Sequence, residues 1–142
     1  MGESDQWGGG GDEAAQTGRK HVFIVNGAAE FLNLMRDLFQ DEHYNVTTTN
    51  FVPRTFDQVS AMRPDLILVD VAAGQHSGWD LLERLHAGAA TQGIPVIVVS
   101  TNPALMDRAR AEADRYGGSA FLSKPFDLDE LLDVVTSLIG PA

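Results

Sequence analysis

The feature that most constrains the fold is a run of four apolar residues, Leu66 to Val69, which ends on the carboxylate of Asp70. An apolar run without alternation is typical of a strand buried on both faces, as in a parallel sheet covered by helices. Packing alone gives no reason for a carboxylate at the exit of such a strand. In open parallel sheets, ligands and chemistry lie just beyond the carboxyl ends of the strands. We therefore expect the other strands to bring further polar groups to the same edge as Asp70.

Short β-rich segments alternate with segments of helical apolar spacing along the rest of the chain. The expected strands are residues 21–25, 45–49, 65–70, 94–100 and 119–123. The expected helices cover residues 31–39, 53–62, a segment around 81–85, 102–116 and a last segment after Asp127. This alternation predicts an α/β fold with a parallel sheet covered on both faces. Because crossovers are right-handed, we expect a doubly wound, five-stranded sheet of order 2-1-3-4-5.

Several residues indicate where the helices begin. Pro53 suits the first turn of the second helix, and Asn102 with Pro103 suits the start of the fourth. Asp127 is expected to cap the last helix, with Glu130 three places on as its partner in a reciprocal capping box.

The first 19 residues are polar and rich in glycine, so they cannot bury enough apolar area to offset the entropy of ordering. We expect a flexible tail over residues 1–19 and one domain over residues 20–142. The glycines at 8–11 are not followed by Lys-Ser or Lys-Thr, as a phosphate-binding loop would require.

Charge and composition exclude several classes of function. Ten basic and 20 acidic side chains give a formal charge of -10, which would repel nucleic acid, so no direct nucleic-acid partner is expected. Without cysteine there is no disulfide, no thiolate nucleophile and no cysteine-held metal, and the four histidines lack ligand-like spacing. No apolar run is long enough for a signal peptide or a membrane span, which predicts a cytoplasmic protein without a membrane partner.

Polar groups lie at the carboxyl ends of four of the expected strands: Asn26 with Gly27, Asp70, Ser100 and Lys124. In the expected order these ends surround one crevice at the switch point of the sheet. A carboxylate, a hydroxyl and an ammonium together suit a small anion or a phosphoryl group. Asp70 can act as nucleophile, Lys124 can neutralise phosphoryl oxygens and Ser100 can donate a hydrogen bond to one of them. Each also has a plainer interpretation: a turn cap, a surface lysine and an ordinary strand-end hydroxyl.

With these residues in place, positions 20–140 resemble a response-regulator receiver domain. The resemblance is carried by LILVDVAAG around Asp70, by VIVVS ending in Ser100, and by AFLSKPF, which contains Phe121, Lys124 and Pro125. It implies a flavodoxin-like (βα)5 fold and a protein that is not an enzyme. It also implies that Asp70 accepts a phosphoryl group from a sensor histidine kinase or a phosphotransfer protein. Ser100 and Phe121 would then be switch residues, and the bond from Lys124 to Pro125 would be cis.

The sequence departs from the family at the end of the first strand, where receivers carry two adjacent acids and this chain has Asn26 and Gly27. The remaining ligands for Mg²⁺ would be Asp70, the Asn26 amide oxygen, the backbone carbonyl of Ala72 and water. Mg²⁺ prefers an octahedron of oxygens that includes carboxylates. One carboxylate lost at about 4 Å removes about 4 kcal/mol per unit of cation charge at an effective dielectric constant of about 20. We expect weak Mg²⁺ binding and a direct pair between Asp70 and Lys124.

Three hypotheses about function follow. The first is a stand-alone receiver in two-component phosphorelay signalling, phosphorylated on Asp70 with weakened Mg²⁺ dependence. The second is a pseudo-receiver, a protein-interaction module in which the pair of Asp70 and Lys124 is structural. The third, a small α/β phosphatase or flavin-binding protein, lacks a second acid–base residue and a cofactor loop.

The resemblance also implies an output surface, made by the fourth helix, the fifth strand and the last helix. A downstream protein, or a second copy of the chain in a homodimer, would bind there. The rim of this surface would carry the charged residues Arg108, Arg110, Arg115 and Asp129.

Overall fold

The computed structural model describes residues 19–51, 54–72 and 74–142. Within them the chain forms five strands and six helices. The strands are β1 (His21–Val25), β2 (Asn45–Thr49), β3 (Leu66–Asp70), β4 (Val96–Ser100) and β5 (Ala120–Ser123). The helices are α2 (Ala29–Asp41), α3 (Thr55–Met62), α4 (Ser77–Ala87), α5 (Pro103–Ala111), α6 (Ala113–Tyr116) and α7 (Leu128–Ile139).

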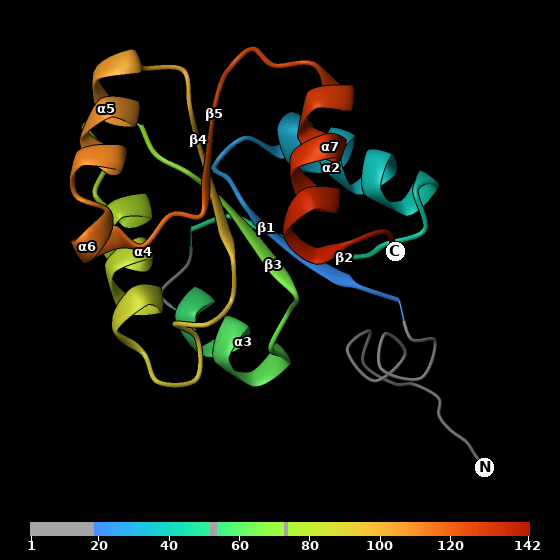
Figure 1. The fold of residues 1–142 in the computed structure, drawn as a ribbon, viewed down its shortest axis with the longest axis horizontal. Helices are drawn as coiled ribbons and strands as arrows, with labels where there is room; N and C mark the ends of the chain where they lie inside the picture. Colours follow the sequence, from blue (N-terminus) through green and yellow to red (C-terminus); the bar gives the residue numbers. More distant parts are fainter. Residues whose placement is uncertain (1–18, 52–53, 73) are drawn as a thin grey trace.

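The five strands form one parallel sheet of order β2-β1-β3-β4-β5, which confirms the predicted topology. Helices α2 and α7 lie on one face of this sheet, and α3 to α6 lie on the other (Figure 1). In the register, Val25 pairs with Val69 and Asp70 pairs with Val99. The carboxyl ends of β1, β3, β4 and β5 therefore meet at one edge of the sheet.

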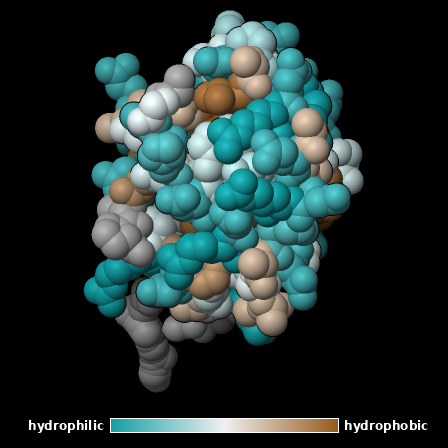
Figure 2. Space-filling view, turned by 90° about the vertical axis from the view of Figure 1, so that its left-hand side faces the viewer, coloured by the Kyte–Doolittle hydropathy of each residue, from teal (hydrophilic) through white to brown (hydrophobic). Residues whose placement is uncertain are grey.

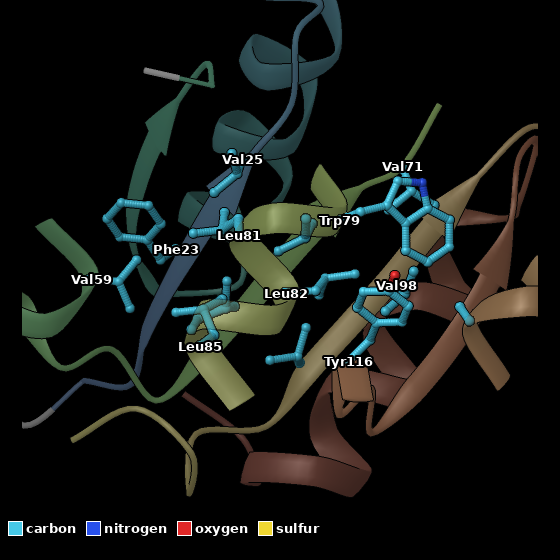
Figure 3. Packing of buried hydrophobic residues seen from close by; sticks show 14 of the residues in the cluster. Phe23, Val25, Val59, Val71, Trp79, Leu81, Leu82, Leu85, Val98 and Tyr116 are labelled. Carbon is cyan, nitrogen blue, oxygen red and sulfur yellow. The ribbon is translucent and has the colours of Figure 1, made fainter. Parts of the chain in front are cut away.

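Two apolar clusters, one on each face, account for the unbroken apolar runs of the central strands. Along β1, Val22 and Ile24 belong to the cluster under α2 and α7, whereas Phe23 and Val25 belong to the other cluster. Figure 3 shows this second cluster, where Phe23 and Val25 face Leu81 of α4. Because neighbouring residues of a strand point to opposite faces, a strand covered on both sides is apolar at every position.

The predicted helix at residues 102–116 is interrupted at Glu112, whose backbone leaves the helical region at φ -108° and ψ 35°. Its start is confirmed, because the Asn102 side chain accepts hydrogen bonds from the backbone N–H groups of Ala104 and Leu105. The short helix α6 after the break buries Tyr116 against Trp79, with ring centroids 4.8 Å apart (Figure 3). Apolar spacing alone does not predict this break, because the apolar residues on both sides of it keep a helical spacing.

The predicted capping box of α7 is wrong. Asp127 is the N-cap residue, but its side chain makes no capping hydrogen bond. Both Asp127 and Glu130 are exposed, so water can satisfy the N–H groups of this first turn. The predicted position of Pro53 lies outside the described residues, and α3 begins at Thr55. Across the described ranges, no helix is both long and apolar enough to span a membrane.

Candidate functional site

Asp70 and Lys124 form an ion pair at the carboxyl edge of the sheet. The Lys124 Nζ atom lies 2.9 Å from Asp70 Oδ1, and 19% and 16% of the two side chains are exposed. Lys124 directly follows β5, so its long side chain spans the width of β4 to reach the end of β3. The direct pair expected from the sequence is therefore present, and solvent still reaches the carboxylate.

The Lys124 side chain is held in place by aromatic residues and by the backbone. Its ammonium lies 4.1 Å from the ring centroid of Phe31, near the start of α2, and that ring meets Phe126 edge-on at 6.4 Å. The backbone N–H of Lys124 donates to the carbonyl of Ser100 at 2.8 Å, and the peptide bond to Pro125 is cis, as expected. The sequence did not identify Phe31 as a partner of Lys124, because an aromatic residue in the apolar stripe of a helix is expected to belong to the hydrophobic core.

Ser100 lies at the same edge, but its hydroxyl has another partner. The residue is fully buried, and its Oγ accepts a hydrogen bond from the backbone N–H of Asn102 at 3.1 Å. Alternation along β4 places Ser100 on the face of Val98, whereas Asp70 continues the opposite face, that of Leu68. Within the described ranges, no hydrogen bond joins the Ser100 hydroxyl to Asp70. That this hydroxyl donates a hydrogen bond to a phosphoryl oxygen stays a prediction.

Phe121 lies on the same face of the sheet as Ser100. It pairs in register with Val98, is half-buried, and packs against the cluster of Figure 3. The Arg110 guanidinium lies 5.3 Å from its ring centroid, and a Cβ atom at Gly118 would come within 2.8 Å of the ring. Phe121 is therefore held between an exposed cation and the core, and its role as a switch stays a prediction.

Asn26 directly follows β1, beside Asp70 in the register, and is 2% exposed. Its Oδ1 accepts a hydrogen bond from the backbone N–H of Ala28 at 2.8 Å, which fixes the turn into α2. Its Nδ2 is buried, and within the described residues it has no hydrogen-bond partner. Gly27 is exposed, and a Cβ atom added there would meet nothing within 4 Å.

The residues expected to bind Mg²⁺ fit that ion poorly. Asp70 is paired with Lys124, the Asn26 oxygen accepts from Ala28, and the Ala72 carbonyl accepts from the backbone N–H of Gln75 at 3.3 Å. The described part of the chain contains no group of three or more His, Cys, Asp or Glu that could hold a metal. The unpartnered buried atom is an N–H donor, and Mg²⁺ requires oxygen acceptors. The strength of Mg²⁺ binding stays a prediction.

Two of the rim residues predicted on the output surface, Arg108 and Arg115, are held by partners in the structure. Arg108 pairs with Glu112 at 3.1 Å and lies 4.5 Å from the ring centroid of Trp79. Arg115 pairs with Glu83 of α4 at 3.0 Å, which ties α6 to that helix. Figure 2 shows that mostly hydrophilic residues cover the side of the molecule where α4, α5 and α6 lie. Specific recognition on this side would therefore depend on polar contacts.

Gly78 is a site-supporting residue that the sequence pattern did not identify. It lies in the first turn of α4, where an added Cβ would come within 2.4 Å of the Asp70 carbonyl oxygen and 3.2 Å of Val71 Cγ1. Only a residue without a side chain lets α4 approach the end of β3 this closely. The sequence signal that could have identified Gly78 is its position: a glycine in the first turn of the helix that follows the Asp70 strand.

Gly78→Ala should therefore destabilise the protein by about 1–3 kcal/mol, the usual range for overpacking. The gain in helix propensity, about 0.5–1 kcal/mol, acts in the opposite direction but is smaller. Urea unfolding gives the free energy, with Gly93→Ala as the control because a Cβ there meets nothing within 4 Å. Equal stability of the Gly78 variant and the unmodified protein would contradict the close contact.

Comparison with characterised proteins gives relatives over most of the chain. The polar-differentiation response regulator DivK of Brucella anthropi is 31% identical over 124 residues, covering 87% of this chain and 98% of the relative. DivK of Brucella ovis is 30% identical over the same length, with the same coverage.

Solved structures share the fold. Chemotaxis protein CheY4 of Vibrio cholerae superposes with a TM-score of 0.74 at 19% identity, covering 84% of this chain and 98% of CheY4. A response regulator protein of Burkholderia multivorans has a TM-score of 0.67 at 25% identity, covering 87% of this chain and 98% of that protein. The receiver domain of the sensor histidine kinase PA1611 of Pseudomonas aeruginosa, solved with a magnesium ion in its active-site cleft, has a TM-score of 0.74 at 20% identity, covering 86% of this chain and 98% of that domain.

The sequence family described as the response regulator receiver domain matches residues 22–136, which include Asp70, Ser100, Lys124 and most of β1 and α7. With this match and relatives at 30–31% identity, the chain belongs to the response regulator receiver domains of two-component signalling.

Proposed function

We propose that this receiver accepts a phosphoryl group on Asp70 and signals in the cytoplasm through protein contacts. The donor would be a phosphohistidine on a sensor histidine kinase or a phosphotransfer protein. The observation that carries the proposal is the pair of Asp70 and Lys124, 2.9 Å apart at the carboxyl edge of a parallel sheet and open to solvent.

In the proposed step a carboxylate oxygen of Asp70 attacks the phosphorus atom of the phosphohistidine. A P–O bond forms, the P–N bond breaks, and the electron pair of that bond returns to the imidazole nitrogen. The products are an acyl phosphate on Asp70 and an unphosphorylated histidine on the donor. Lys124 already lies against the attacking carboxylate, so it can stabilise negative charge on the phosphoryl oxygens without moving far.

The aspartyl phosphate would carry about 1.5 to 2 negative charges in place of the single charge of the Asp70 carboxylate, so the pocket that now holds one ion pair would become more negative. Lys124 would shift toward the new oxygens, and its backbone N–H is bonded to the Ser100 carbonyl. Ser100 and Phe121 lie on the face covered by α5, so a rearrangement there would reach the surface formed by α5, β5 and α7. A downstream protein, or a second copy of the chain, would bind this surface.

Intact-mass measurement after incubation with acetyl phosphate tests the proposal. We expect one phosphoryl group per chain in the unmodified protein and none in Asp70→Asn. Asp107→Asn is the matched control, because the Asp107 side chain is 82% exposed on α5, and it should be phosphorylated like the unmodified protein. The proposal is wrong if neither acetyl phosphate nor a phosphorylated kinase modifies the chain in the presence or absence of Mg²⁺.

The second candidate function is a pseudo-receiver that binds its partner without phosphorylation. It is supported by the same ion pair, which neutralises Asp70 already, and by the poor fit of the site to Mg²⁺. An absence of the phosphoryl adduct under all conditions, together with partner binding that survives Asp70→Asn, would favour this function.

A further inference from the structure

We infer that the Asn26 side chain supplies part of the stabilisation that a metal ion would otherwise give to a phosphoryl group at this site. Its buried amide N–H donates a hydrogen bond to the phosphoryl group on Asp70, and together with the Lys124 ammonium it allows Asp70 to be phosphorylated without a divalent cation. This inference rests on the proposed function, and it names the group that holds the phosphoryl oxygens.

The hydrogen bond to Ala28 identifies which end of the Asn26 amide is the donor. A backbone N–H can only donate, so the atom that accepts it at 2.8 Å must be the amide oxygen. The other end is then the NH₂ group, which has two N–H donors and no partner among the described residues. Buried donors without acceptors are rare in folded proteins and require an explanation.

The backbone places this donor beside Asp70. Asn26 follows the pair of Val25 and Val69, so it neighbours Asp70 across the parallel register. Alternation puts Asn26 on the face of Ile24, and Asp70 lies on the face of Leu68, which belongs to the same cluster. Lys124 follows Leu122 of that cluster with the same alternation. All three polar side chains therefore leave the sheet on the side covered by α2 and α7.

The chemistry of this group favours an anion over a cation. The site offers an ammonium and an unpartnered amide NH₂, and both are donors that suit phosphoryl oxygens. The two acids that receivers carry here, together with one divalent cation, would sum to a formal charge of zero. Asn26 and Gly27 also sum to zero without a cation, so the phosphoryl group meets the same local formal charge here as in a receiver that has both acids and the cation. Losing the acids and the metal together keeps the electrostatic balance of the site.

The rate of phosphorylation by acetyl phosphate, measured by intact mass in EDTA and in excess Mg²⁺, tests the inference. The unmodified protein should react at nearly the same rate in both buffers. Asn26→Asp keeps the oxygen that accepts from Ala28 but replaces the donor with a negative charge. In EDTA its rate should fall by about tenfold or more, since a hydrogen bond to a charged group contributes roughly one to two factors of ten.

Matched variants separate this role from a structural one. Asn33→Asp makes the same chemical change on the exposed side of α2 and should behave like the unmodified protein in both buffers. Asn26→Asp combined with Gly27→Asp, which has open space for the second side chain, should be the variant that Mg²⁺ accelerates. Calorimetric titration should show tighter Mg²⁺ binding to this double variant than to the unmodified protein. Thermal unfolding confirms that each variant is folded.

The outcomes distinguish the two proposals. If EDTA abolishes phosphorylation of the unmodified protein while Mg²⁺ restores it, or if folded Asn26→Asp reacts like the unmodified protein in EDTA, the role of Asn26 is wrong and the proposed function stands. If the unmodified protein forms no adduct in either buffer or from a phosphorylated kinase, the proposed function itself is wrong, and the role assigned to Asn26 is wrong with it.

Discussion

Lys124→Met should slow phosphorylation of Asp70 by about 10²–10³-fold, the usual effect of removing one preorganised donor from a site where negative charge develops. Methionine keeps an unbranched apolar side chain for contact with the Phe31 ring, which now lies 4.1 Å from the ammonium. The change therefore removes mainly the charge that lies 2.9 Å from the Asp70 carboxylate. The initial rate of adduct formation from acetyl phosphate, followed by intact mass, measures the effect.

The only other lysine in the sequence, Lys20, provides the control. It precedes β1 at the opposite end of the sheet from Asp70, so Lys20→Met removes the same charge from the protein but not from the site. Its rate should stay close to that of the unmodified protein. A Lys124→Met rate within a few-fold of the control would show that the ion pair seen in the structure does not assist the transfer.

Phe39→Ala should lower the free energy of unfolding by about 3–5 kcal/mol. The Phe39 ring is fully buried on α2, where it meets Tyr44 edge-on at a centroid distance of 5.7 Å, and truncation leaves a cavity under that helix. A domain of this size has a total stability of about 5–15 kcal/mol, so the loss is a large share of it. Urea unfolding followed by circular dichroism measures the change.

Leu34→Ala is the matched control on the same helix, since Leu34 is 50% exposed. Alanine is the better helix former, and little burial is lost, so the change in stability should stay within about 0.5 kcal/mol. Similar losses in the two variants would mean that α2 is not packed as the structure shows.

The site was only partly predictable from the sequence. Asp70 and Lys124 could be paired because each follows an apolar run, and the order of strands in a right-handed parallel sheet places the ends of those runs at one edge. The orientation of the Ser100 hydroxyl toward the Asn102 N–H was not predictable in this way. The donor end of Asn26 and the close approach of Gly78 also required the folded backbone.

Sequence by itself determined the class of fold, the order of the strands and the edge where Asp70 and Lys124 meet. Apolar periodicity indicates which segments are strands and which are helices, and right-handed crossovers then limit the order of the strands in a parallel sheet. The tertiary structure alone decided which face each polar side chain uses, where the fourth predicted helix breaks at Glu112, and which buried amide lacks a partner. Those features depend on distances between segments that are far apart in the chain. A hydrogen bond or a close contact forms only after both segments have been placed, and local sequence preferences do not encode that placement.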